Sequence, residues 1–94
     1  MEIRIQSLHF DATDKLIAYA EKKVGKLDRF IDSEAAQVIF KIIKPQSAMN
    51  KEVSITVGGL HAQKLCNTFE EAIDQCVDAL KGQIEKKKNK TDRG

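Results

Sequence analysis

One stretch, residues 13–31, constrains the fold of this chain more than any other. Its apolar side chains recur at steps of three and four residues, which places them on one face of a single helix. These residues are Leu16, Ala20, Val24, Leu27 and Ile31. Thr13 is a suitable N-cap, and Asp14 suits the positive end of the helix dipole. A helix with one apolar face must bury it against another element, so we expect a packed core.

The opposite face of the same helix is basic. Lys15, Lys22, Lys26 and Arg29 recur at steps of seven, four and three residues, with Lys23 on the flank. At about 100° per residue these four cations fall within roughly 60° of one another. Such a stripe is either a solvated face that keeps the protein in solution or a surface that binds a polyanion.

Two residues beside the basic stripe each allow two interpretations. Gly25 costs the helix roughly 1 kcal/mol relative to alanine. Close approach of a phosphate backbone would explain it, and so would a glycine that is merely tolerated. Tyr19 could stack on a nucleobase or could lie at the edge of the core.

Charge is distributed unevenly along the chain although its net charge is only +2. Residues 31–80 contain four basic and seven acidic side chains, whereas residues 81–94 contain six basic and two acidic ones. The basic residues near the C-terminal end include Lys81, Lys86, Lys87, Lys88 and Lys90. A polarised distribution of this kind favours a polyanionic partner.

Alternating apolar and polar residues predict strands at residues 2–8, 36–44, 51–57 and 60–66. Gly58-Gly59 separates the last two strands and is typical of a two-residue hairpin turn.

A second helix is predicted to begin after Thr68, where Thr68 and Glu71 fit a capping box. Its apolar face ends at Ile84. Residues 85–94 contain no apolar side chain that burial could hold, so they form either a solvated helical extension or a frayed tail.

The predicted element order is β-α-β-β-β-α within one domain spanning residues 1–94. Because strand–helix–strand crossovers are right-handed, we expect the first two strands to be parallel. Both helices have one apolar stripe, and the strands have one strongly apolar face. The fold that satisfies these patterns is an α+β two-layer sandwich, a four-stranded sheet with both helices on one face. The two helices then lie side by side, and their basic parts form one surface.

Catalytic and metal chemistry finds little support in the sequence. The candidate ligands and nucleophiles are His9, His61, Cys66 and Cys76, whose spacings match no zinc motif. We therefore expect no enzyme activity, no metal and no cofactor. No apolar run is long enough to span a bilayer, no secretory signal is evident, and two cysteines without framework spacing fit a reducing cytoplasm.

The ordered motifs resemble the ribosome hibernation-promoting factor family, which includes ribosome-associated translation inhibitors and was formerly labelled sigma-54 modulation protein. The resemblance covers essentially the whole chain. Its motifs are IRIQSLHF–T–D–L at residues 3–16, EKKVGKLDRFID at 21–32, the glycine pair at 58–59, and FEEAIDQCVDALKGQIEKKK at 69–88.

The resemblance implies a fold like that of a double-stranded-RNA-binding domain. It also implies binding to the small ribosomal subunit through rRNA contacts in the channel used by mRNA and tRNA. Translation would be inactivated by occupancy during stress, as ribosome hibernation, with no chemistry on a substrate. Two alternatives remain, namely a generic structured-RNA-binding or RNA-chaperone module, and a protein-interaction domain with no role in RNA binding.

The family's basic positions carry over to both helices. Lys23 and Lys26 match positions of the first helix that are usually basic, and Lys86 and Lys88 match positions near the end of the second. The RNA-binding residues expected from the resemblance and the charge pattern are Lys22, Lys23, Lys26, Arg29, Lys81, Lys86, Lys87, Lys88 and Lys90. The chain departs from the family pattern at Ala79 and Gly82, where a lysine and an arginine are common.

Long members of the family add a C-terminal domain that joins two ribosomes. Here ten residues follow Ile84, and they contain no aromatic or β-branched aliphatic side chain. The solvent face of the predicted sheet is polar, with residues such as Gln6 and Thr56. We therefore expect a monomer when free, of the short hibernation-promoting type, and stable ribosome dimers would need a second factor.

Overall fold

The computed structural model of the protein describes residues 1–8, 10–31, 34–43 and 50–93, with side chains described as far as Lys86. The elements in chain order are β1 (Glu2–Leu8), α1 (Asp14–Gly25), the 3-10 helix η1 (Lys26–Arg29), β2 (Ala35–Ile42), β3 (Lys51–Val57), β4 (Leu60–Cys66) and α2 (Phe69–Arg93).

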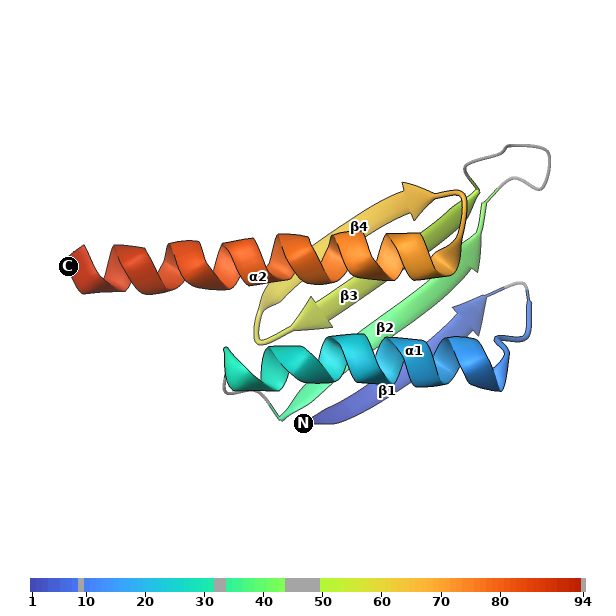
Figure 1. Ribbon diagram of the computed structural model, residues 1–94, viewed down its shortest axis with the longest axis horizontal. Helices are drawn as coiled ribbons and strands as arrows, with labels where there is room; N and C mark the ends of the chain where they lie inside the picture. The colour runs from blue at the N-terminus through green and yellow to red at the C-terminus, as the bar shows by residue number, and fades with distance from the viewer. Residues whose placement is uncertain (9, 32–33, 44–49, 94) are drawn as a thin grey trace.

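The four strands form one mixed sheet in the order β1-β2-β3-β4. The first pair is parallel and the other two pairs are antiparallel. Figure 1 shows α1 over the β1–β2 side of the sheet and α2 over the β3–β4 side, both on the same face. The predicted α+β two-layer sandwich, with the order β-α-β-β-β-α, is therefore confirmed.

Alternation along each strand decides which side chains enter the core. Val38, Ile55 and Ala62 are register partners in one row across the sheet, and all three are buried. Phe40 pairs with Val53 in the next inward-facing row, and both are fully buried. Burying each large aliphatic side chain contributes roughly 1.5–3 kcal/mol, so these rows fix the register of the sheet.

An aromatic cluster joins the start of α2 to the sheet and to the connection between β1 and α1. The Phe69 ring lies 5.4 Å from that of Phe40 and 4.8 Å from that of Phe10, centroid to centroid. The Phe10 and Phe69 rings are stacked, with an interplanar angle of 9°. This cluster ties the first turn of α2 to the core at the end remote from the C-terminus.

The helix starts follow the predicted caps. Thr13 Oγ1 accepts a hydrogen bond from the Leu16 backbone N–H at 3.1 Å. Thr68 Oγ1 likewise accepts from the Glu71 N–H at 3.1 Å, which is the forward half of the predicted capping box. Each cap satisfies an amide that the helix itself leaves unpaired, and so defines where the helix begins.

The hairpin between β3 and β4 is also as predicted. Gly58 and Gly59 have φ angles of 56° and 81°, in the left-handed region that glycine adopts without strain. Two positive φ angles are typical of a type I′ turn, whose twist matches that of the flanking strands.

The end of the first helix differs from the prediction of one continuous helix over residues 13–31. The α-helix ends at Gly25, and Lys26–Arg29 continue as a tighter 3-10 turn. Both the Phe30 and Ile31 amides donate to the Leu27 carbonyl, at 2.9 and 3.1 Å. This turn ends the helix, because 3-10 turns commonly satisfy the last carbonyls of an α-helix. It also keeps Leu27 fully buried.

Smaller differences concern the second strand and the solvent face of the sheet. Strand β2 spans 35–42 rather than 36–44. Of the two forms expected after Ile84, the backbone adopts the helical extension, which reaches Arg93. On β4, Leu65 alternates with buried Cys66 and is 41% exposed, on the face turned away from the helices. That face is therefore less uniformly polar than predicted.

Candidate nucleic-acid interface

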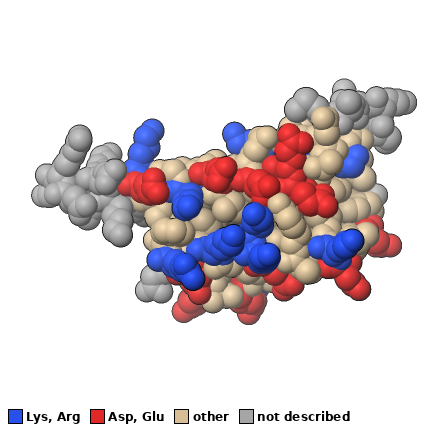
Figure 2. All heavy atoms as spheres, viewed as in Figure 1, with Lys and Arg blue, Asp and Glu red and all other residues tan. Residues whose placement is uncertain are grey.

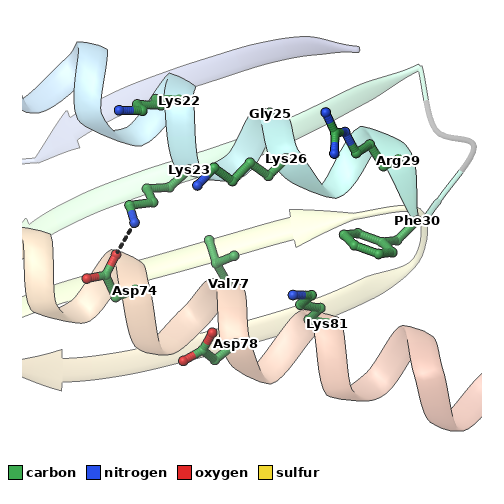
Figure 3. Close-up of a pocket in the computed structure, with 10 residues that line it drawn as sticks. All are labelled: Lys22, Lys23, Gly25, Lys26, Arg29, Phe30, Asp74, Val77, Asp78 and Lys81. Carbon is green, nitrogen blue, oxygen red and sulfur yellow. Dashed lines mark ion pairs between the residues drawn. The ribbon is translucent and has the colours of Figure 1, made fainter.

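A groove runs between α1–η1 on one side and α2 on the other (Figure 3). The first side contributes four cations, a glycine and an aromatic ring, and the second contributes two carboxylates, a valine and a lysine. The residues that line the groove are Lys22, Lys23, Gly25, Lys26, Arg29, Phe30, Asp74, Val77, Asp78 and Lys81.

The α1–η1 side of the groove carries a cationic bank of three side chains. Lys22, Lys26 and Arg29 are exposed, and none of them takes part in an ion pair within the described part of the chain. Their spacing of four and then three residues keeps them on one side of the segment, and the buried face anchors that segment. The result is a row of fixed positive charges open to solvent.

The α2 side of the groove is different in sign. Asp74 and Asp78 lie one turn apart on α2, and Lys81 follows three residues later. Figure 2 shows acidic side chains along α2 and basic side chains gathered on and beside α1. A phosphate that enters the groove is therefore attracted to one side and repelled by carboxylates on the other.

A polar tie connects the two helices across the groove. The Tyr19 hydroxyl donates to both carboxylate oxygens of Asp74, at 2.8 and 2.9 Å. This hydrogen bond raises the pKa of Tyr19 above its ordinary value, because it stabilises the protonated hydroxyl that donates it. Partial burial and the negative charge of Asp74 raise the pKa further. The Lys23 ammonium lies 3.7 Å from the same carboxylate and 5.5 Å from the Tyr19 ring centroid. Lys23 therefore already has an acidic partner, unlike the three cations of the bank.

Phe30 lies at the other end of the groove, directly after η1. Its side chain is 44% exposed, and the Lys81 ammonium lies 5.2 Å from its ring centroid. Sequence reasoning missed this residue because it considered aromatic contacts only at Tyr19. Local spacing gives no signal for its exposure, because Phe30 follows the exposed Lys26 by four residues but also follows the buried Leu27 by three.

The structure brings five of the nine predicted RNA-binding residues together. Those five, which all line the groove, are Lys22, Lys23, Lys26, Arg29 and Lys81. Lys86 is exposed farther along α2, outside the groove. Lys87, Lys88 and Lys90 belong to the helical backbone of α2, but their side chains lie outside the described residues.

Lys15 is the remaining residue of the basic stripe, and Gly25 and Gly82 are the two helical glycines. Lys15 is exposed on α1 but is not among the residues that line the groove. Among the described residues, a methyl group at Gly25 would meet only the Ile3 Cδ1 atom at 3.9 Å, and one at Gly82 would meet nothing within 4 Å. Neither glycine is therefore required by packing within the protein.

Among the described residues, Cys66, Cys76 and His61 do not belong to any group of side chains that could hold a metal ion. Cys66 and Cys76 are buried free thiols, and Cys76 Sγ donates to the Val53 carbonyl at 3.3 Å. Burial raises the pKa of Cys76 to about 11, so its reactive thiolate is disfavoured. His61 shares a 2.9 Å hydrogen bond with Thr56 on the solvent face, and His9 lies outside the described residues.

The described part of the chain offers neither a metal site nor a membrane-spanning helix. The described residues contain no group of three or more His, Cys, Asp or Glu side chains that could hold a metal ion. The described helices also include none that is long and apolar enough to cross a membrane.

Comparison with known proteins gives one consistent result. Residues 3–92 match the family model described as sigma 54 modulation protein / S30EA ribosomal protein. The chain is 33% identical over 95 residues to the ribosome hibernation promoting factor of Azotobacter vinelandii, with 96% of the chain and 85% of that protein covered. It is 40% identical over 58 residues to the factor of the same name from Acidithiobacillus ferridurans, covering 61% of the chain and 73% of that protein.

Solved structures share the fold. The N-terminal domain of Thermus thermophilus Protein Y superposes with a TM-score of 0.74 at 28% identity, covering 92% of this chain and 98% of that one. A ribosomal subunit interface protein from Coxiella burnetii has the same TM-score of 0.74 at 23% identity, covering 95% and 99% of the two chains. The second similarity is evidence for the fold alone.

Proposed function

The chain belongs to the sigma 54 modulation protein / S30EA ribosomal protein family, and from this premise we propose that it is a ribosome hibernation factor. It binds the small ribosomal subunit through rRNA and occupies the channel used by mRNA and tRNA. Translation stops because the channel is filled, with no reaction on a substrate. Such a factor acts in the cytoplasm, where the ribosomes are.

The observation that carries this proposal is the cationic bank of the groove. Lys22, Lys26 and Arg29 project from the exposed side of a segment whose other side is buried, and they have no acidic partner within the described part of the chain. Unpaired cations on a fixed scaffold gain free energy from phosphates without first breaking an internal ion pair, and they release counterions from the RNA. Such a cationic bank contacts the phosphates of a folded RNA and so recognises the shape of its backbone, not its base sequence.

The direct test is sedimentation of the purified protein with purified small subunits at several salt concentrations. If five cations (the four without an ion pair in the groove and Lys86) each contact about one phosphate, the slope of log K against log salt is about −3.5 to −4.5. A slope near zero would contradict binding through phosphates. Chemical footprinting of the rRNA with and without the protein then locates the site.

The same experiment separates the proposal from a generic RNA-binding module. A ribosome-specific factor binds small subunits much more tightly than it binds an isolated RNA duplex of equal charge. Equal affinity for the two would favour the generic module. Failure to sediment with ribosomes at low salt would favour a protein-interaction domain.

We further propose that the free protein is a monomer and acts on single ribosomes, with a second factor needed for ribosome dimers. Analytical ultracentrifugation of the free protein tests the first part. A sucrose gradient of purified ribosomes mixed with the protein alone tests the second, because efficient ribosome dimers in that mixture would contradict it.

A further inference from the structure

We propose that Phe30 is a stacking platform for an unpaired nucleobase of the RNA whose phosphates the groove binds. This inference rests on the proposed function, since it concerns the same groove. It adds a base-binding position to a surface that otherwise offers only charge.

Phe30 differs from the other aromatic residues in its exposure. All five aromatic side chains of the protein lie in the described part of the chain, and Phe30 is the exposed one. Phe40 and Phe69 are buried, and Phe10 is stacked on Phe69. Tyr19, for which the sequence allowed either base stacking or a position at the edge of the core, is hydrogen-bonded to Asp74. An apolar ring left 44% exposed loses part of the free energy of burial, which a stacked base would recover.

The Phe30 ring lies beside the cations of the groove. Phe30 lines the groove immediately after Arg29, and Figure 3 shows its ring directed into the groove toward Lys81. Its backbone is fixed by the 2.9 Å hydrogen bond to the Leu27 carbonyl. A nucleotide whose phosphate contacts Arg29 or Lys81 therefore has a flat apolar surface within reach of its base.

The Phe30 ring and the Lys81 ammonium suit the two parts of a nucleotide. An aromatic ring beside cations is the combination that single-stranded RNA-binding surfaces use, because a base stacks on the ring while its phosphate pairs with the cation. Lys81 is already held near the ring, so one residue pair would serve both parts of a nucleotide. Base stacking also needs an unpaired nucleotide, which loops and bulges of folded RNA provide.

The test is a series of Phe30 variants in the sedimentation assay with purified small subunits. Phe30→Leu keeps apolar bulk but removes the flat ring, and we expect it to weaken binding by about five- to one-hundred-fold. Phe30→Tyr and Phe30→Trp should bind within about threefold of the original protein, because both keep a stacking surface. The salt slope of Phe30→Leu should be unchanged, since no phosphate contact is lost. The matched control is Leu65→Ala, another exposed apolar residue, at 41%, on the far face of the sheet; it should bind normally.

A second comparison separates stacking from support of Lys81. If the ring acts only by positioning Lys81, Phe30→Leu will have no effect in a Lys81→Met background, and the proposal is overturned. If the ring stacks on a base, most of the loss will persist in that background. Circular dichroism confirms that each variant is folded.

A photo-crosslinking residue placed at position 30 gives an independent result. Crosslinks to rRNA bases in a loop or bulge support the proposal, and crosslinks only to a ribosomal protein overturn it. Normal binding by Phe30→Leu, together with loss of binding by charge reversal at Lys26 and Arg29, would reject stacking and leave the proposed function standing. Absence of binding by the unaltered protein would reject both.

Discussion

The two helical segments that form the groove bury one face in the same core but differ in the charge they present to the groove. The α1–η1 segment offers Lys22, Lys26 and Arg29 without acidic partners in the described residues. Within the groove, α2 offers two carboxylates and Lys81. A groove between two lysine-containing helices therefore need not be basic on both sides. We therefore expect RNA phosphates to lie against α1–η1.

The largest expected effect tests whether the inner faces of the two helices serve the fold alone. Leu27 and Leu80, one from each side, are both fully buried. Replacing either with alanine leaves a cavity and should lower the free energy of unfolding by about 2–5 kcal/mol. Denaturant unfolding measures this, and Leu65→Ala on the exposed face should change it by less than about 0.5 kcal/mol. Binding to small subunits should be retained at temperatures where the variants remain folded.

The second prediction concerns the cationic bank. Lys26→Glu with Arg29→Glu should weaken binding to small subunits at least tenfold, because two attractions become repulsions, while stability stays within about 1 kcal/mol. The matched control is Lys15→Glu with Lys64→Glu, an equal charge change at exposed residues outside the groove. Its effect should be smaller, since neither Lys15 nor Lys64 lines the groove.

The same assay tests whether the α2 side of the groove binds phosphate more weakly than the α1–η1 side. Lys81→Glu with Lys86→Glu changes the charge of α2 by the same amount as the α1–η1 double reversal. We expect a smaller loss of affinity, because carboxylates already limit phosphate binding on that side. A loss equal to that of the α1–η1 double variant would show that both sides bind phosphate equally.

The third prediction concerns Asp74, which lies in the groove, pairs with Lys23 and accepts from Tyr19. Asp74→Asn removes a negative charge from the groove and releases Lys23, so binding should tighten by about two- to fivefold at low salt. The salt slope should also become steeper by about 0.7–0.9, as expected for one additional phosphate contact. Weaker binding with an unchanged slope would mean that Asp74 contacts the RNA or positions a residue that does.

Asp74→Asn also has a readout independent of RNA. The chain contains one tyrosine and no tryptophan, so its near-ultraviolet absorbance reports ionisation of Tyr19 directly. The variant should lower the pKa of Tyr19 toward its ordinary value. In the original protein the raised pKa stabilises the fold at pH below about 10, and that contribution is lost as the pH rises through the raised pKa. Tyr19→Phe should abolish this part of the pH dependence.

The smallest expected effect concerns the two helical glycines. Gly25→Ala and Gly82→Ala each meet open space or an ordinary contact, so each should stabilise the protein by about 0.4–1 kcal/mol. If the RNA backbone approaches the α1–η1 segment closely, Gly25→Ala will weaken binding despite the gain in stability. Gly82, outside the groove, serves as the control and should bind normally. Equal binding by both variants would show that Gly25 is only tolerated.

Much of this protein could be predicted from its sequence because burial leaves a local signature. The period of three to four residues gave the buried face of the first helix, and strict alternation gave the strands to within two residues of their ends. Thr13, Thr68 and the glycine pair marked helix starts and a turn through bonds and φ angles that involve only neighbouring residues. Local signals of this kind do not depend on distant parts of the chain.

Which cations of the groove are unpaired was decided only by the tertiary structure. Lys23 and Tyr19 meet Asp74 across more than fifty residues of sequence, and no periodicity within one helix reports the partner that the other helix supplies. Likewise, the exposure of Phe30 depends on the 3-10 turn that ends the first helix and on how α2 crosses near it. Sequence periodicity predicts which side of an element is buried. Which cations remain free to bind RNA depends on the contacts between two packed elements.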